Sequence, residues 1–267
     1  MTTVRVAMAG LSLELELLGG AGPMLAEGLG PYLEPSVEAA QPGAPTLKLR
    51  LAADDGFPDL FDPLVVRGRL GAFEVRGDGM HGQIARDQAE LSAKGGAFAL
   101  WAALRLACAL WLLPRGGLLL HGACVEERGA AHAFLGPSGA GKTTLAGKLR
   151  ARVISDEVTC ANSALRVFGH PFRSKLGDGC APREGLPLAS LSILSHALPG
   201  EGPRARQLSK AEAVRALLAR IFLPVRDAQT LAAALEIAGA LADPGVRALS
   251  LPLDSRAAAF ALEASPQ

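Results

Sequence analysis

The sequence predicts an α/β protein in which a small antiparallel β-rich region precedes a larger domain built around a glycine-rich loop. Apolar and polar residues alternate in short stretches of the first part of the chain, which is the pattern of half-buried strands. Further along, an apolar stretch leads directly into GPSGAGKT at residues 136–143, and a helical stretch follows. The sequence PRGG at residues 114–117 separates the two patterns, so we expect a first region at 1–115 and a second domain at 116–267.

The strands of the first region follow from the alternation. Residues 4–8 and 11–17 alternate on either side of Ala9-Gly10, which predicts two strands joined by a tight turn. The alternation returns at Thr46–Leu51 and across Leu64–Ile84, where glycines divide it into short pieces. We therefore expect a small antiparallel sheet.

An apolar run at residues 97–113 closes the first region. It carries Arg105 near its middle and is shorter than the roughly 20 apolar residues of a membrane span, so we expect a buried helix. The N-terminus lacks the basic-then-apolar layout of a signal peptide, which favours a cytoplasmic protein. The region carries no catalytic motif, and its strands are candidates for binding a peptide substrate by strand addition.

Composition excludes several classes of protein. The 267 residues include 27 bases and 26 acids, and this balance lacks the basic excess of proteins that bind nucleic acid or anionic membranes. The four cysteines are far apart and form no CxxC pair, which argues against a zinc site and a disulfide framework. We expect neither nucleic acid nor membrane as a partner, and the composition leaves open a homo-oligomer.

The second domain begins with a predicted hairpin. Apolar runs at residues 118–125 and 131–135 flank the turn sequence EERG at 126–129. The second run enters the glycine-rich loop, Thr143–Arg150 should be a helix, and a strand at Val153–Ile154 should end at an acidic turn.

Two further helices are expected near the end of the chain. Ser209 and Glu212 have the spacing of a capping box, and the apolar residues after them recur at helical spacing as far as Ile221 and Phe222. A second helix should span Ala228–Leu241 and stop at the sequence DPG.

The loop sequence fits the GxxxxGK[ST] pattern of phosphate-binding loops. Its glycines allow successive backbone N–H groups to point at one anion, and the following helix adds its positive end. Lys142 is suited to contact the β- and γ-phosphates of ATP or GTP, and the Thr143 hydroxyl is suited to bind Mg²⁺. The alternative is a glycine-rich turn that binds nothing. The residues expected to contact the nucleotide are Gly136, Pro137, Ser138, Gly139, Ala140, Gly141, Lys142, Thr143 and Thr144.

Two acids follow the loop at short range. Asp156 lies fourteen residues after Lys142 (156 minus 142), a gap that holds one helix, a turn and a strand. Asp156 and Glu157 should therefore return beside the phosphates, where one acid binds Mg²⁺ and the other accepts a proton from an attacking hydroxyl. The alternative is a solvated pair of turn acids.

Two other side chains are candidates for the same site. His121 ends the apolar run that pairs with the strand before the loop, and it is either a site residue or a hydrogen-bonded core histidine. Arg173, in the sequence GHPFR, has the chemistry to contact a phosphate or a substrate anion, and the alternative is a surface arginine in a turn.

The motifs LLLHGACV, FLGPSGAGKTTLAGKL, VISDEV, FGHPF and LSKAEAVRALL occur in this order over residues 115–225. In that order they resemble the HPr kinase family, whose fold is shared with ATP-dependent phosphoenolpyruvate carboxykinase. The resemblance implies a mixed, partly antiparallel sheet around the loop and phosphoryl transfer to a serine-type hydroxyl. It also implies that Asp156 is the catalytic base, that Glu157 takes the place of a metal-associated Asp, and that His121 lies near the transferred phosphate.

The sequence departs from true HPr kinases in lacking a counterpart of their protein-substrate and phosphorolysis segments. It is closer to small HPr-kinase-related serine kinases, some of which accompany peptide-modification pathways. We therefore expect Mg-ATP-dependent phosphorylation of a hydroxyl on a peptide or a small substrate other than HPr. The alternative is a catalytically reduced accessory protein that binds a nucleotide or a peptide, because Glu157 replaces the family's Asp.

Overall fold

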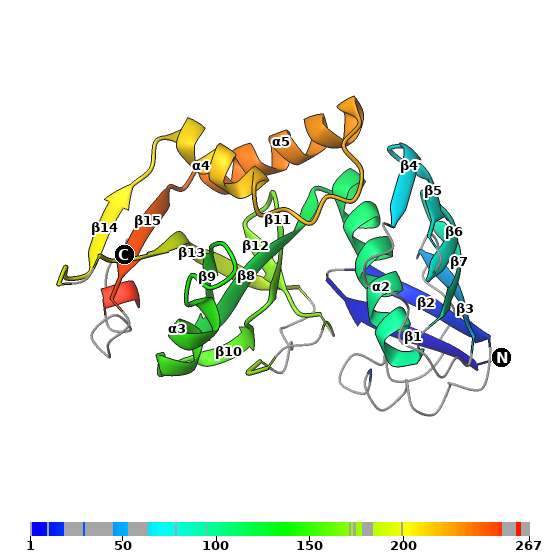
Figure 1. Cartoon of the computed structure of the whole chain (residues 1–267), viewed down its shortest axis with the longest axis horizontal. Helices are drawn as coiled ribbons and strands as arrows, with labels where there is room; N and C mark the ends of the chain where they lie inside the picture. Colours follow the sequence, from blue (N-terminus) through cyan, green and yellow to red (C-terminus); the bar gives the residue numbers. More distant parts are fainter. Residues whose placement is uncertain are drawn as a thin grey trace. The chain divides into compact units, whose positions relative to one another are not determined.

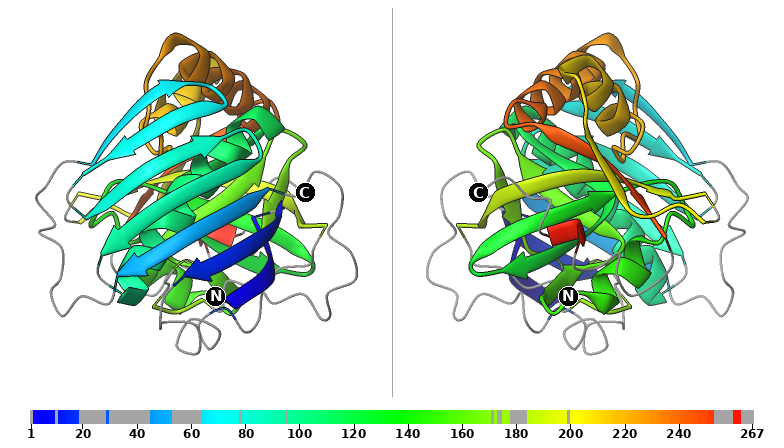
Figure 2. Two further views of the ribbon diagram at one scale, coloured as in Figure 1. Left: turned by 90° about the vertical axis from the view of Figure 1, so that its right-hand side faces the viewer. Right: turned by 90° about the vertical axis from the view of Figure 1, so that its left-hand side faces the viewer.

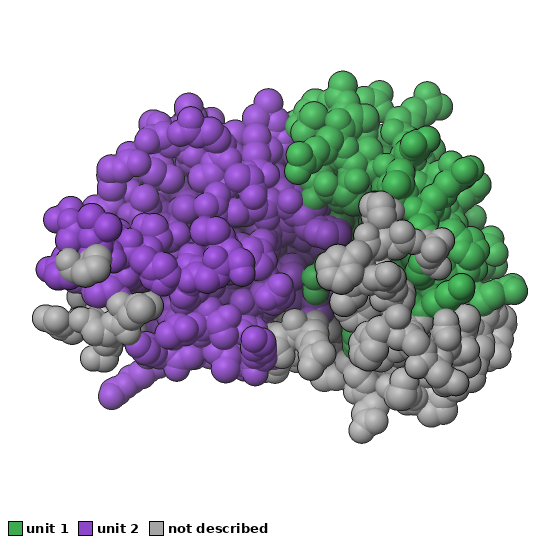
Figure 3. All heavy atoms as spheres, viewed as in Figure 1, with its two compact units in different colours: residues 1–115, 223–233 green, residues 116–222, 234–267 purple. Residues whose placement is uncertain are grey.

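The computed structural model describes residues 2–9, 11–18, 29, 45–52, 64–77, 79–94, 96–170, 172, 175–177, 184–198, 200–252 and 260–262. The chain divides into two compact units, which Figure 3 colours separately. Unit 1 comprises Met1–Arg115 and Leu223–Ala233, and unit 2 comprises Gly116–Phe222 and Ala234–Gln267. The first boundary falls within the PRGG sequence, whereas nothing in the local sequence assigns residues 223–233 to unit 1.

Unit 1 contains a seven-stranded sheet with the order β1-β2-β3-β7-β6-β5-β4, seen from one side in the left view of Figure 2. Strand β3 is parallel to both of its neighbours, so the expectation of a purely antiparallel region is wrong. Residues 19–45 separate β2 from β3, and a parallel pair requires a connection of at least about a dozen residues. The strands are β1 Thr2–Met8, β2 Leu11–Leu18, β3 Thr46–Ala52, β4 Val65–Arg69, β5 Ala72–Arg76, β6 Met80–Ala85 and β7 Gln88–Lys94.

The expected apolar helix is present as α2, Gly96–Leu112, and continues into a 3₁₀ turn at Leu113–Arg115. It packs on β3, β6 and β7, and its Trp111 is buried, with Nε1 donating a hydrogen bond to the Ala85 carbonyl at 2.9 Å. Burial within unit 1 explains why this helix is apolar except for Arg105. Among the helices that the structure describes, none is both long and apolar enough to cross a membrane.

Unit 2 contains an eight-stranded sheet with the order β10-β8-β11-β12-β13-β15-β14, while β9 pairs with β13 and β8 (Figure 1). The β9–β13 and β13–β15 pairs are parallel and the others are antiparallel, which confirms an α/β fold with mixed, partly antiparallel sheets. The strands are β8 Gly117–Glu127, β9 Ala130–Leu135, β10 Arg152–Ser155, β11 Val158–Asn162, β12 Arg166–Phe168, β13 Leu186–His196, β14 Arg204–Gln207 and β15 Val246–Leu251.

Strand β8 has different neighbours along its two edges. One edge pairs with β10 and then β11, which follow each other along β8. The other edge pairs with β9 as far as the Gly122–Leu135 pair, and Leu120 then bridges Ile221 on that same edge. Because Leu120 also pairs with Thr159 of β11, Ile221 must lie on the β9 side.

Three helices accompany this sheet in sequence order: α3 Lys142–Lys148, α4 Lys210–Leu218 and α5 Ala228–Ala242. The capping box of α4 is confirmed, since Ser209 Oγ accepts from Glu212 N and Glu212 Oε2 accepts from Ser209 N. The expectation that the helical pattern continues through Ile221 and Phe222 is wrong. The helix ends at Leu218 because the next apolar residues pair with β8 instead.

The core beside α3 fixes the helix against the sheet. Leu145 and Leu149 pack with Phe134 of β9 and with Leu194 of β13. Burying side chains of this size contributes about 1.5–3 kcal/mol each. The start of α3, and with it the end of the glycine-rich loop, is therefore held by a buried apolar cluster.

Candidate functional site

The glycine-rich loop, residues 136–141, connects β9 to α3. Gly139 and Gly141 have φ values of 80° and 88°, in the left-handed region that other residues rarely adopt. A Cβ on Gly136 would lie 2.9 Å from Ala140 Cβ and 3.1 Å from the Leu194 carbonyl oxygen. The turn thus requires glycine for two separate reasons, conformation at its end and space at its start.

Lys142 opens α3 and turns back across the loop. Its side chain is 6 % exposed, and Nζ donates to the carbonyl oxygens of Gly136 at 3.0 Å and Pro137 at 2.9 Å. Burial lowers the pKa of this ammonium below its ordinary value, the charge of Glu157 opposes that shift, and the charge of Arg220 adds to it. A cation is therefore fixed over the loop by the loop's own backbone.

The remaining loop residues differ in their access to solvent. Ala140 is buried and donates its N–H to the Pro137 carbonyl at 3.1 Å, which closes the turn. Thr143 is half-buried at the second position of α3. The exposed members of the predicted nucleotide-binding set are Pro137, Ser138, Gly139 and Thr144.

His196 also contacts the loop, and sequence analysis missed it. Its Nε2 lies 2.6 Å from the Gly139 carbonyl oxygen, to which it donates. Strand β13 is parallel to β9 and extends three residues beyond the Ile193–Leu135 pair, which brings its last residue to the loop. No local motif could have revealed this contact, because it depends on the pairing of two strands distant in sequence.

The two acids lie at the junction of β10 and β11 and differ sharply in exposure. Asp156 is 3 % exposed, and its Oδ1 accepts a hydrogen bond from the Lys175 N–H at 2.9 Å. The Glu157 side chain is 51 % exposed, with Oε1 3.9 Å from His121 Nδ1. The backbone carbonyl of Glu157 accepts from the Gly122 N–H at 3.1 Å, so the sheet fixes the main chain of this turn.

The FGHPF sequence supports the acidic turn from the side of β11. The buried His170 ring donates from Nε2 to the Val158 carbonyl at 2.8 Å and accepts at Nδ1 from the Phe172 N–H at 3.3 Å. These two bonds fix the neutral Nε2–H form of the ring. Arg173, the predicted phosphate or substrate contact, lies outside the described residues.

His121 and Arg220 meet through their backbones. The His121 N–H donates to the Arg220 carbonyl at 2.7 Å, and the His121 side chain remains partly exposed toward Glu157. The Arg220 guanidinium donates from Nη1 to the Ala216 carbonyl at 2.8 Å, while its Nε is buried without a hydrogen-bond partner in the described structure. Sequence analysis missed Arg220 because it read this segment as helix.

The structure therefore brings Lys142, Glu157 and His121 into one neighbourhood and adds Arg220, whereas the Asp156 carboxyl is held by Lys175. Among the described residues, no group of three or more His, Cys, Asp and Glu side chains is arranged to hold a metal ion. A Mg²⁺ ion bound with a nucleotide commonly uses one or two protein oxygens together with phosphates and water. The Thr143 hydroxyl and the Glu157 carboxylate fit that smaller requirement by their chemistry.

His132, interpreted from sequence as a structural residue, belongs to a second polar cluster. Its Nδ1 lies 2.9 Å from Ser190 Oγ, and the buried Arg247 donates from Nη2 to Ser192 Oγ at 3.4 Å. Burial lowers the pKa of His132, Glu127 opposes the shift, and Arg247 adds to it. We call His132, Ser190, Ser192 and Arg247 the buried cluster.

No family model matches the sequence, and a search of curated proteins finds no relative.

Proposed function

We propose that this chain is an HPr kinase-related enzyme that transfers a phosphoryl group from Mg-ATP to a serine-type hydroxyl of a peptide or a small substrate. The observation that carries the proposal is the buried Lys142 ammonium, which lies over a glycine-rich loop between a strand and a helix. Such a loop offers several N–H groups and one cation to a single anion, as phosphates require.

Binding is the first part of the proposed reaction. Backbone N–H groups of Ser138, Gly139 and Gly141 would hold the phosphates together with the Lys142 ammonium. That ammonium would turn from the loop carbonyls that now accept from it toward the phosphate oxygens. Gly139 leaves open space on the loop, since a Cβ there would meet no atom within 4 Å. Thr143 and Glu157 would hold Mg²⁺, which neutralises charge on the phosphates during transfer.

Transfer is the second part. The acceptor hydroxyl oxygen forms a bond to the γ-phosphorus while the bond from that phosphorus to the β,γ-bridging oxygen breaks, and ADP leaves with those electrons. The proton of the hydroxyl moves to a carboxylate, a role that the resemblance to HPr kinases gives to Asp156. His121 stands beside Glu157 and is proposed to approach the transferred phosphate.

The different exposure of the two acids bears on these roles. Asp156 is buried and hydrogen-bonded to Lys175, so an acceptor reaches it only if that cover moves or the hydroxyl enters from the loop side. Glu157 is open and interacts electrostatically with Lys142. Exposure thus favours Glu157 for metal or acceptor contact.

The burial of Asp156 also favours a second candidate function, a protein that binds a nucleotide or a peptide without transferring phosphate. In that case Asp156 would be a structural group that orders the segment at Lys175. Loss of the catalytic base would leave nucleotide binding in place, because the loop and Lys142 are separate from it.

Calorimetric titration with Mg-ATP and Mg-ADP, followed by incubation with ATP and a degenerate library of serine-containing peptides, tests both functions. The kinase predicts nucleotide binding and a gain of about 80 Da on selected peptides, the mass of one phosphoryl group. Asp156→Asn should abolish the mass gain and retain binding. Binding without mass gain would exclude these peptides as acceptors and favour the accessory function or a small substrate. Absence of binding to either nucleotide would overturn both functions.

A further inference from the structure

Arg220 is placed by main-chain bonds next to the point where the glycine-rich loop leaves the sheet. Strand β9 pairs with β8 up to Gly122, and the chain then departs as the loop at Gly136. At the next position along the same edge of β8, the His121 N–H donates to the Arg220 carbonyl. The Phe222 N–H donates to the Leu119 carbonyl at 2.9 Å. Residues 220–222 therefore pair with β8 along the edge where its pairing with β9 has ended.

The Arg220 side chain is held by a hydrogen bond, and the part of the chain that the structure describes supplies no ion pair to it. Its Nη1 bonds to the Ala216 carbonyl one turn back, and its Nε is buried with no partner among the described residues. A guanidinium has five N–H donors, and these two observations leave most of them without a described protein acceptor. Burial without full pairing is costly and lowers the pKa of this group.

The position of Arg220 beside another cation adds to that cost. Arg220 and Lys142 are close enough for the charge of one to lower the pKa of the other, and Glu157 is the acid that interacts with Lys142. Among the described residues, the charges that act on Lys142 are one acid, Glu157, and one further cation, Arg220. The two cations exceed that acid by one positive charge, which a bound polyanion would neutralise.

We propose that Arg220 is a second phosphate-binding cation of the site and contacts the terminal phosphate of a nucleoside triphosphate alongside Lys142. This inference rests on the proposed function, and it names a catalytic residue that the sequence motifs do not contain. An arginine fork matches the oxygens of a phosphoryl group and stabilises charge on them during transfer. The main-chain bond from the His121 N–H to the Arg220 carbonyl places the two residues side by side at this edge of β8.

The test compares binding of Mg-ADP with binding of a non-hydrolysable Mg-ATP analogue by calorimetry. Arg220→Gln should lower the affinity for the triphosphate analogue by about tenfold or more and the affinity for the diphosphate by much less. The reason is that only the triphosphate analogue carries the terminal phosphate. Arg220→Lys keeps the charge, and its affinity for the triphosphate analogue should lie between those of Arg220→Gln and the unchanged chain.

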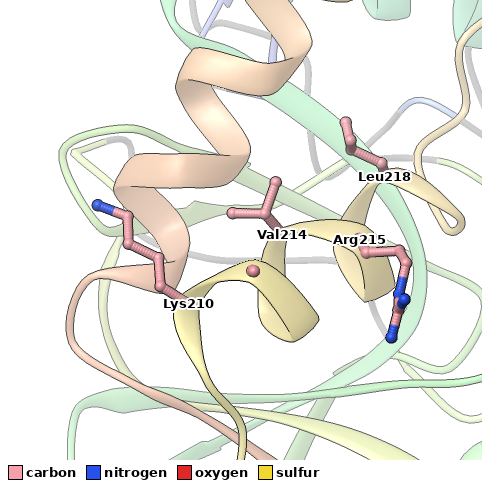
Figure 4. A pocket seen from close by; sticks show the side chains of 5 residues that line it. Lys210, Val214, Arg215 and Leu218 are labelled. Carbon is pink, nitrogen blue, oxygen red and sulfur yellow. The ribbon is translucent and has the colours of Figure 1, made fainter.

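A matched control is available on the same helix. Arg215 is exposed and lines a shallow groove of about 610 Å³ on α4, with Lys210, Ala211, Val214 and Leu218 (Figure 4). Arg215→Gln removes the same charge away from the loop and should leave both affinities unchanged. Thermal unfolding of each variant separates a folding defect from a binding defect.

The outcomes distinguish this inference from the proposed function. If Arg220→Gln lowers the affinity for both nucleotides equally, or for neither, the inference about Arg220 is wrong while the loop remains a nucleotide site. If Arg220→Gln does not fold, the Arg220→Lys affinity ratio decides instead, since a lysine retains the charge without the fork. If the unchanged chain binds neither nucleotide, the proposed function itself fails.

Discussion

Two polar clusters of unit 2 make opposite use of similar side chains. In the buried cluster, Ser190 pairs across strands with His132 and Ser192 with Arg247, so regular sheet register sets which polar residues face each other. In the second cluster, which we call the loop cluster, the residues come from a helix start, an acidic turn, a strand and a post-helix segment: Lys142, Glu157, His121 and Arg220. The first is closed from solvent, and the second is partly open.

The difference shows how structure separates stability from binding in residues that look alike in sequence. Both clusters contain a histidine and a buried cation. Only the loop cluster places two cations together around an exposed carboxylate and a backbone turn with left-handed glycines. We infer that the loop cluster, with its two cations and its left-handed glycines, binds a ligand. The buried cluster, whose residues face each other across the sheet, stabilises the fold.

We expect the largest effect from a substitution in the loop cluster. Lys142→Met removes the ammonium that spans Gly136 and Pro137 and should weaken Mg-ATP binding by about 1,000-fold, or ~4 kcal/mol. The free energy of unfolding should also fall, by about 1–3 kcal/mol, because the buried Gly136 carbonyl loses its donor. Calorimetry measures the affinity, and Lys148→Met on the exposed side of α3 is the control. Comparable losses in both variants would contradict the assigned role.

The second prediction breaks the buried cluster. Arg247→Ala removes a buried side chain and leaves Ser192 with a lost partner and a cavity, so the free energy of unfolding should fall by about 2–4 kcal/mol. Nucleotide affinity should remain within twofold, as roughly expected for sites without shared partners. Urea unfolding measures the loss. Arg206→Ala on the neighbouring exposed strand β14 should cost less than about 1 kcal/mol, since it breaks only a surface ion pair.

A third prediction tests whether the close packing at Gly136 matters for nucleotide binding. Gly136→Ala adds a Cβ that would press on Ala140 Cβ and the Leu194 carbonyl, so the loop must shift. Mg-ATP affinity should drop about tenfold and stability by roughly 1–2 kcal/mol, in the range of overpacking costs. The hairpin variant Gly129→Ala has a left-handed φ of 79° and open space, so it isolates the conformational cost alone. Unchanged affinity in Gly136→Ala would show that the tight start of the loop is irrelevant to binding.

The smallest expected effect concerns pH. The pKa of His132 is lower in the folded state than its ordinary value near 6.5, so the unfolded chain takes up a proton before the folded one does. Stability is therefore full above that ordinary value and declines as pH falls toward the folded pKa, by at most about 1.4 kcal/mol per pH unit. Urea unfolding between pH 7.5 and 5 should show a flatter profile in His132→Gln than in the exposed-residue control His81→Gln. Identical profiles in the two variants would rule out His132 as the source.

The local elements were predictable because local signals specify them. The hairpin turn at Arg128-Gly129 takes positive φ at both residues, and the capping box at Ser209 forms both of its bonds. The apolar run of α2 needed only its length and its single charged residue, Arg105. Each of these features depends on residues within a few positions of one another.

The remaining features depend on pairings between distant segments, which a local pattern does not encode. Ile221 and Phe222 fit helical spacing as well as they fit a strand, and only β8 decides between them. His196 reaches the loop through the parallel β9–β13 pair, and β3 lies between two parallel neighbours through equally distant pairing. The chemical roles assigned to Asp156, Glu157 and His121 stay predictions.

The alignment of β8 with its neighbours has a consequence for how the site assembles. A slip by a single position along that strand would carry His121 away from Glu157 and from Arg220 at once, and would reverse which face each side chain occupies. Nucleotide binding should therefore require the native register of β8. A fragment that ends before residue 219 would keep the loop, the histidine and both acids, yet it would lack the final piece that closes this edge.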